Sequence, residues 1–133
     1  MNSNNLVKAV QQLCRDFGYL PHISVHEQPP LTSSQKSVAL LEFPQFRSIE
    51  GSKHGRITYR VTLKLLHRAA NLTAEERSLI ISQAQTDALD IFSQLSSNKH
   101  VALIKNLQLD SLTRVMPHGS IGAIATADVI TIF

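Results

Sequence analysis

Residues 72–97 read LTAEERSLIISQAQTDALDIFSQLSS and predict one long amphipathic helix. Thr73 and Glu76 form a capping box at its start, because each side chain can bond the other residue's backbone amide. Apolar side chains then recur at steps of three or four residues. They are Ile80, Ala84, Ala88, Ile91 and Leu95, and Ile81 and Phe92 widen the stripe. A stripe this wide predicts a helix that covers a sheet.

The segment just before this helix, Arg56–Arg68, predicts the strand that the helix covers. Its side chains alternate between apolar and polar, as in a strand that buries one face. The apolar set is Ile57, Tyr59, Val61, Leu63 and Leu65, and the polar set is Thr58, Arg60, Thr62 and Lys64. We expect the apolar set to pack under the helix and the polar set to face solvent or a partner.

The remaining segments complete an α+β pattern. Asn5–Phe17 has helical spacing, and four further segments have strand patterns. These strands are His22–Glu27, Ser37–Phe43, Ala102–Met116 and Ala123–Phe133. The phase of Ala102–Met116 slips near Asp110–Leu112, which indicates a bulge, and residues 119–122 read as a hairpin turn before the last strand. We expect the last strand to lie inside the sheet beside Ala102–Met116. The pattern predicts an antiparallel, mixed sheet of about five strands with two helices packed on one face.

One segment, Gln45–Gly55, has little periodicity. Phe46 and Ile49 are its large apolar residues, and the rest is mostly polar or glycine. We interpret residues 45–55 as a mobile loop between two paired strands, because long irregular loops in compact domains are usually functional or disordered. The predicted organisation is a single α+β domain over residues 1–133 that carries this loop.

Length and composition fit a globular protein rather than a membrane or secreted one. A chain of 133 residues with 43% hydrophobic residues can build one core. No run approaches the roughly 18 apolar residues of a membrane span, and the first residues lack the pattern of a secretion signal. Cys14 is the one cysteine, so an internal disulfide and a cysteine-based zinc site are excluded.

The sequence contains no pattern that points to catalysis, a cofactor or a metal. His22 and His26 are four residues apart, but on a strand that spacing makes a poor chelate. The other histidines, among them His67, stand alone in loops or at strand ends, so we expect solvated side chains. Glu75 and Glu76 are explained by the helix dipole. We therefore predict a protein that is not an enzyme and needs no cofactor.

Charge is distributed unevenly along the chain, although the formal net charge is only +3. A basic group precedes the long helix and an acidic group lies on it. The residues that we predict at an interface with another subunit or a partner are Arg47, Lys53, Arg56, Arg60, Lys64, Asp87 and Asp90. Two solvated surfaces would explain this layout, and so would a head-to-tail contact between copies. Nucleic acid is a third option, but the basic group lacks the aromatic residues that stack on bases.

The order and proportions of these elements resemble the tail terminator, or tail-completion, proteins of long-tailed bacteriophages and prophages. The matching features are the helix Asn5–Phe17, the strands around the loop, the strand Ile57–Leu66 leading into the helix Thr73–Ser97, and the two closing strands. The resemblance implies a small α+β protein that forms a ring, typically a hexamer, which caps the tail tube and presents a surface to the head connector. It implies no catalytic residues.

Two function classes follow from these observations. The first is a structural phage protein whose partners are itself, the tail tube protein and the head-tail connector protein, in the host bacterial cytoplasm during assembly and then in the virion tail. The second is a small ferredoxin-like binding or regulatory domain, because fold does not fix function. The mass in solution and the neighbouring genes would discriminate the two classes.

Overall fold

The computed structural model describes residues 1–24, 37–51, 54–68, 71–116 and 120–133. Within these residues, two helices and six strands follow one another. They are α1 (Ser3–Asp16), β1 (Leu20–Ser24), β2 (Ser37–Glu42), β3 (Gln45–Glu50), β4 (Arg56–Arg68), α2 (Ala74–Leu95), β5 (Val101–Met116) and β6 (Ser120–Ile132). This content confirms the predicted α+β class.

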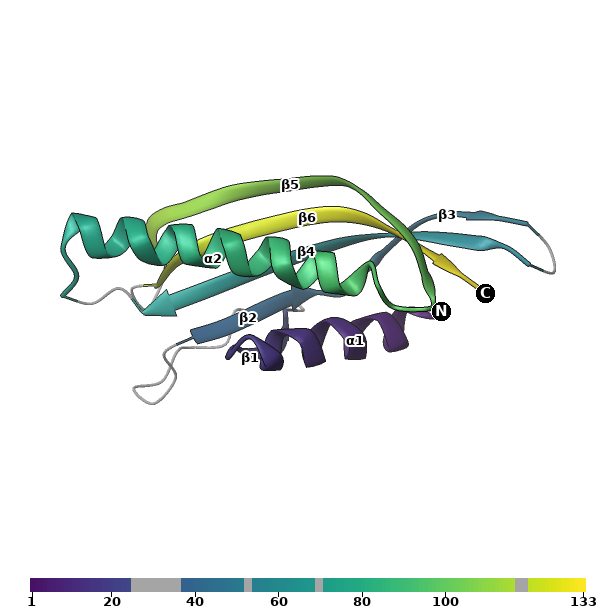
Figure 1. Ribbon diagram of the computed structural model, residues 1–133, viewed down its shortest axis with the longest axis horizontal. Helices are drawn as coiled ribbons and strands as arrows, with labels where there is room; N and C mark the ends of the chain where they lie inside the picture. The colour runs from purple at the N-terminus through teal and green to yellow at the C-terminus, as the bar shows by residue number, and fades with distance from the viewer. Residues whose placement is uncertain (25–36, 52–53, 69–70, 117–119) are drawn as a thin grey trace.

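The strands form one mixed sheet in the order β1-β2-β4-β6-β5. β1 runs parallel to β2, and the other neighbours are antiparallel. β6 therefore lies between β4 and β5. Its pairing with β5 confirms the prediction that the two closing strands are neighbours. Because β4 and β5 run in the same direction on either side of β6, α2 is the crossover of a split β-α-β unit. Both helices lie on one face of the sheet (Figure 1).

The capping box predicted for α2 is present. The Thr73 hydroxyl accepts a hydrogen bond from the Glu76 amide at 3.2 Å, and the Glu76 carboxylate reaches the Thr73 amide at 3.5 Å. The predicted stripe is buried from Ala84 onward, whereas Ile80 is only partly buried. The buried residues of α2 are Ala84, Ala88, Ile91, Phe92 and Leu95. They share one core with the apolar face of β4 and with Leu6, Val10 and Cys14 of α1.

The predicted mobile loop at 45–55 is wrong for its first half. Gln45–Glu50 forms β3, which pairs with residues Arg56–Arg60 of β4 and contains a bulge between Phe46 and Ser48. β2 and β3 pair with the same edge of β4. β2 pairs with the second half of β4 and β3 with the first half, and Phe43 and Pro44 separate the two strands. Backbone pairing gave this segment a regular structure although its side chains have little periodicity, since ladder hydrogen bonds need no apolar residue.

Two details of the closing strands also differ from the predictions. Register shifts in β5 lie between Val101 and Leu103, between Lys105 and Gln108, and between Leu112 and Met116. Only the last of these shifts reaches Asp110–Leu112, the stretch where the sequence predicts a change of phase. Residues 120–122 belong to β6 rather than to a turn. Gly122 is required there by close approach, because a Cβ atom would lie 1.8 Å from the Leu65 carbonyl oxygen.

Candidate functional site

The predicted interface residues fall on three elements. Arg47 lies on β3, and Arg56, Arg60 and Lys64 lie on β4. Asp87 and Asp90 lie on α2, and Lys53 lies outside the described residues. The structure brings the basic residues together along one side of the sheet but does not place them beside the two aspartates. It also shows that two of the seven residues have partners inside the chain.

Arg60 is the first of these two. Its Nε donates to Oδ1 of Asp128 at 3.1 Å, across the paired strands β4 and β6. The side-chain amide of Asn106 donates to the other oxygen of Asp128 at 2.8 Å. The Asn106 bond, and then the hydrogen bond and charge of Arg60, hold the pKa of the Asp128 carboxyl below its usual range, and the charge of Arg47 adds to this. Asp128 is only 8% exposed, so its pair with Arg60 is part of the fold.

This arrangement corrects the expectation that Arg60 simply faces solvent or a partner. Its side chain is 40% exposed and is held by a carboxylate that the sequence analysis did not single out. The signal for Asp128 was present in the sequence, since it is the one charged residue in an otherwise apolar and small strand. A lone acid at such a position needs a partner, because burying an unpaired charge is costly.

Asp87 is the second residue with internal partners. The Tyr19 hydroxyl donates to Oδ2 of Asp87 at 2.6 Å, and the Gln83 amide donates to Oδ1 at 2.9 Å. The Tyr19 oxygen also lies 2.8 Å from Nε2 of His67, whose Nδ1 lies 3.1 Å from the Ser37 hydroxyl. Tyr19 has one hydrogen and gives it to Asp87, so Nε2 of His67 donates to Tyr19, and Nδ1 accepts from Ser37.

The environment of this chain of hydrogen bonds favours the neutral forms of Tyr19 and His67. Burial raises the pKa of Tyr19, and the hydrogen bond and charge of Asp87 raise it further. Burial lowers the pKa of His67, and the charge of Asp87 opposes that effect in part. The expectation that His67 is solvated is therefore wrong. The four residues fasten α2 to β2 and β4, and no sequence motif pointed to them because their positions are far apart.

The three large apolar side chains with the greatest exposure in the described residues, Leu79, Phe46 and Ile49, lie at the two ends of the molecule (Figure 1). β3 and the part of β4 that pairs with it, Arg56–Arg60, project beyond the helices (Figure 1); we call this ribbon the arm. Phe46 and Ile49 are 60% and 55% exposed on the arm, on the face that the helices cover elsewhere. Arg47 and Arg56 are exposed on the same ribbon.

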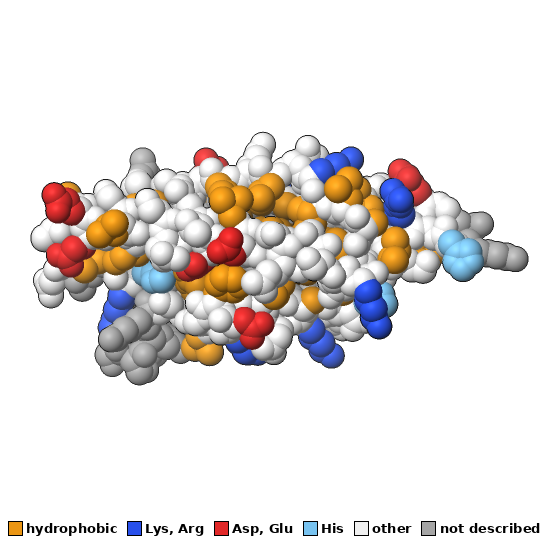
Figure 2. Space-filling model, in the orientation of Figure 1, with side chains coloured by type: hydrophobic (Ala, Val, Ile, Leu, Met, Phe, Trp, Pro, Cys, Tyr) orange, Lys and Arg blue, Asp and Glu red, His pale blue; other side chains and the backbone are white. Residues whose placement is uncertain are grey.

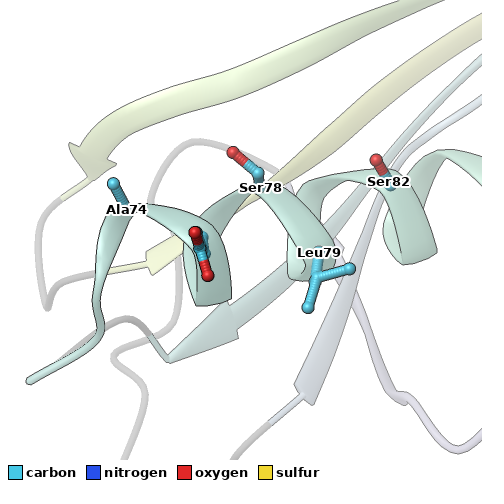
Figure 3. A pocket seen from close by; sticks show the side chains of 5 residues that line it. Ala74, Ser78, Leu79 and Ser82 are labelled. Carbon is cyan, nitrogen blue, oxygen red and sulfur yellow. The ribbon is translucent and has the colours of Figure 1, made fainter.

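The opposite end carries the first turns of α2. Leu79 is 71% exposed there, more than any other large apolar side chain in the described residues. It lines a hollow of about 460 Å³. Ala74, Ser78, Leu79 and Ser82 line this hollow (Figure 3), and Glu75 completes it. Acidic side chains lie at this end and over the middle of α2, whereas most basic side chains lie toward the arm or along the lower edge (Figure 2).

Other kinds of site find no support in the described part of the chain. No group of three His, Cys, Asp or Glu residues there could hold a metal ion, and neither described helix is long and apolar enough to cross a membrane. Burial raises the pKa of the Cys14 thiol to about 12, which makes it a poor nucleophile. Neither the protein-family models nor the curated proteins compared with this chain contain a match. The arm and the start of α2 are therefore the two surfaces that bear on function.

Proposed function

We propose that this chain is a structural protein of a long-tailed bacteriophage or prophage, which forms a ring that caps the tail tube and joins it to the head connector. The carrying observation is that the molecule has two unlike ends. One end is the arm, with exposed Phe46 and Ile49 beside arginines, and the other is the acidic start of α2 with exposed Leu79. Neither surface is self-complementary in charge.

A ring requires such a pair of surfaces. Every copy in a closed ring meets one neighbour through one surface and the other neighbour through a different surface. Unlike charges at the two surfaces favour this head-to-tail contact over a twofold contact, in which each surface would meet its own kind. The order of helices and strands that resembles tail terminator proteins supports the same function, and the proposed partners are further copies, the tail tube protein and the connector.

The topology gives less support to a ferredoxin-like binding domain. That fold has the order β-α-β-β-α-β, in which each helix joins two strands. Here α1 precedes the first strand, and of the two described helices α2 alone crosses between strands of the sheet. On the face of the sheet away from the helices, Arg60 and Asp128 bind each other, so they are not free polar groups for a ligand.

The test is tail assembly with and without this chain. Tail tubes and heads of the phage that encodes it would be produced together, and the particles would be counted by electron microscopy. We expect that removing the chain leaves heads and tubes separate, with tubes of irregular length, and that adding the purified chain restores joined particles. Joined particles with tails of uniform length in its complete absence would contradict the proposed function.

A further inference from the structure

The apolar side chains of the arm stay largely exposed beside their neighbours in the described residues. Phe46 touches Tyr59 edge-on, with ring centroids 6.5 Å apart, yet remains 60% exposed. Ile49 lies opposite Ile57 on the same face of the ribbon. Phe133 lies over Gly55 and is 44% exposed, so it extends this surface. A protruding ribbon with a continuous apolar face is the form that an interaction surface takes.

We infer that the arm of one copy docks against the start of α2 of the next copy, with Phe46 entering the hollow beside Leu79. This contact deepens the proposed function, on which it rests, by naming the two surfaces that meet. The described residues that line the hollow are small or apolar, except for the carboxylate of Glu75. It matches an aromatic side chain that arrives on a basic ribbon.

The occupant must be another copy rather than the same chain. The arm and the first turn of α2 lie at opposite ends of the long axis (Figure 1), and the arm is held in place by its ladder to β4. A molecule cannot fold its arm back without breaking that ladder. The two surfaces of one molecule therefore remain available to two different neighbours.

Charge supports a second copy as the occupant. Arg47 and Arg56 outnumber Glu50 on the described part of the arm. At the start of α2, Glu75 lines the hollow, and Glu75 and Glu76 outnumber Arg77. Arg47 and Arg56 are both exposed, so they act on the docked surface over about the Debye length of 8 Å in physiological salt. Their role is to steer and orient the contact, and the apolar side chains supply its core.

Cysteine cross-linking between two differently substituted chains tests this contact. One chain carries Phe46→Cys and the other carries Leu79→Cys, and Cys14 stays in place because it is buried and its pKa is raised to about 12. We expect an oxidised mixture to give a disulfide-linked dimer and either chain alone to give none. The matched control replaces Phe46→Cys with Leu103→Cys, because Leu103 on β5 is 51% exposed, close to the 60% of Phe46.

Charge reversal provides the second arm of the test. Arg47→Glu on the first chain should lower the initial cross-linking rate by roughly threefold or more, and Glu75→Arg on the second chain should restore it. Arg15→Glu, an exposed change on α1, should leave the rate unchanged. High salt should slow the unmodified pair by screening.

Three outcomes would overturn the inferred contact. They are no cross-link in the mixture at millimolar protein with or without tail tubes, an equal yield with Leu103→Cys, and a dimer of Phe46→Cys with itself. None of these outcomes decides whether the chain caps tails, because the assembly experiment measures that directly. Conversely, a specific cross-link in a protein that is dispensable for joining heads to tails would refute the proposed function and leave the contact standing.

Discussion

Asp128 shows how a single residue controls the local structure of three strands. Its two oxygens are shared between Arg60 on β4 and Asn106 on β5, while its own backbone belongs to β6. Asn106 has a φ of +57°, in the left-handed region that asparagine tolerates better than most residues. It lies within a register shift of β5, so the bond to Asp128 fixes the bulge in place.

We predict that Asp128 stabilises the protein at neutral pH and stops doing so in acid. Its pKa is lower in the folded chain than in the unfolded one, so its contribution is complete above the unfolded value of about 3.9 and is lost as the pH falls through the folded value. Asp128→Asn should reduce the free energy of unfolding at neutral pH by about 1–3 kcal/mol. Urea unfolding as a function of pH measures both effects.

The control for this prediction is Asp110→Asn, which changes an exposed aspartate on β5. It should leave the free energy of unfolding within about 0.5 kcal/mol of the original. Equal losses in the two variants would mean that the Arg60–Asp128–Asn106 arrangement contributes nothing beyond its surface charge.

His67 also makes the protein less stable in acid, but at a higher pH than Asp128 does. Its pKa is lower in the folded chain, because burial disfavours the charged imidazole, so the unfolded chain binds a proton first as the pH falls. Stability is therefore complete above about pH 6.5, the unfolded value, and declines below it. We expect the thermal midpoint to fall between neutral pH and pH 5, and to fall less in a His67→Gln variant.

The matched variant for His67 is His100→Gln, because His100 is exposed. Its thermal midpoint should follow the pH dependence of the original protein. If His67→Gln follows it as well, then the hydrogen bonds from Ser37 through Tyr19 to Asp87 do not hold a neutral imidazole.

At the scale of elements, α2 stabilises the fold through only one of its faces. Ile91 is fully buried against the sheet, whereas Leu79 on the same helix is 71% exposed. Ile91→Ala should lower the free energy of unfolding by roughly 2–5 kcal/mol, because it leaves a cavity in the core. Leu79→Ala should change it by less than about 0.5 kcal/mol. Urea unfolding of the dilute protein measures both, and a loss below about 1 kcal/mol for Ile91→Ala would contradict the assigned core.

The arm is an element whose stability comes from its neighbours. All six residues of β3 are exposed, so burial of their side chains adds little. The ladder to β4 and the continuation of β4 into the buried centre of the sheet hold it in place. An element of this kind can present apolar side chains to a partner without depending on them for its own fold.

At the scale of the whole molecule, the sheet works as a rigid spacer between two unlike ends. β4 begins in the arm and runs to the opposite end of the molecule, where α2 begins (Figure 1). The strand ladders of β4 and β6 span this distance without a register shift. A stiff connection of this type sets the separation of the two contacts that a ring requires of each copy.

The sequence by itself determined the elements with strong periodicity. The bounds of β4, the capping box of α2, the buried residues Ile91 and Leu95, and the pairing of the two closing strands all follow from patterns that span many residues. In these segments, local hydrogen bonding and one-sided burial favour the same structure, and neighbouring residues in the chain are enough to reveal it.

Only the tertiary structure decided which polar residues are free. Arg60 and Asp87 looked like surface charges in the sequence, but partners 68 residues away in each case, Asp128 and Tyr19, bind them within the chain. The strand β3 was hidden for the same reason, since its order comes from pairing with β4 rather than from its own side chains. Contacts between distant segments leave no periodic trace in a single sequence, so the arm and the hollow on α2 became visible only when the chain was folded.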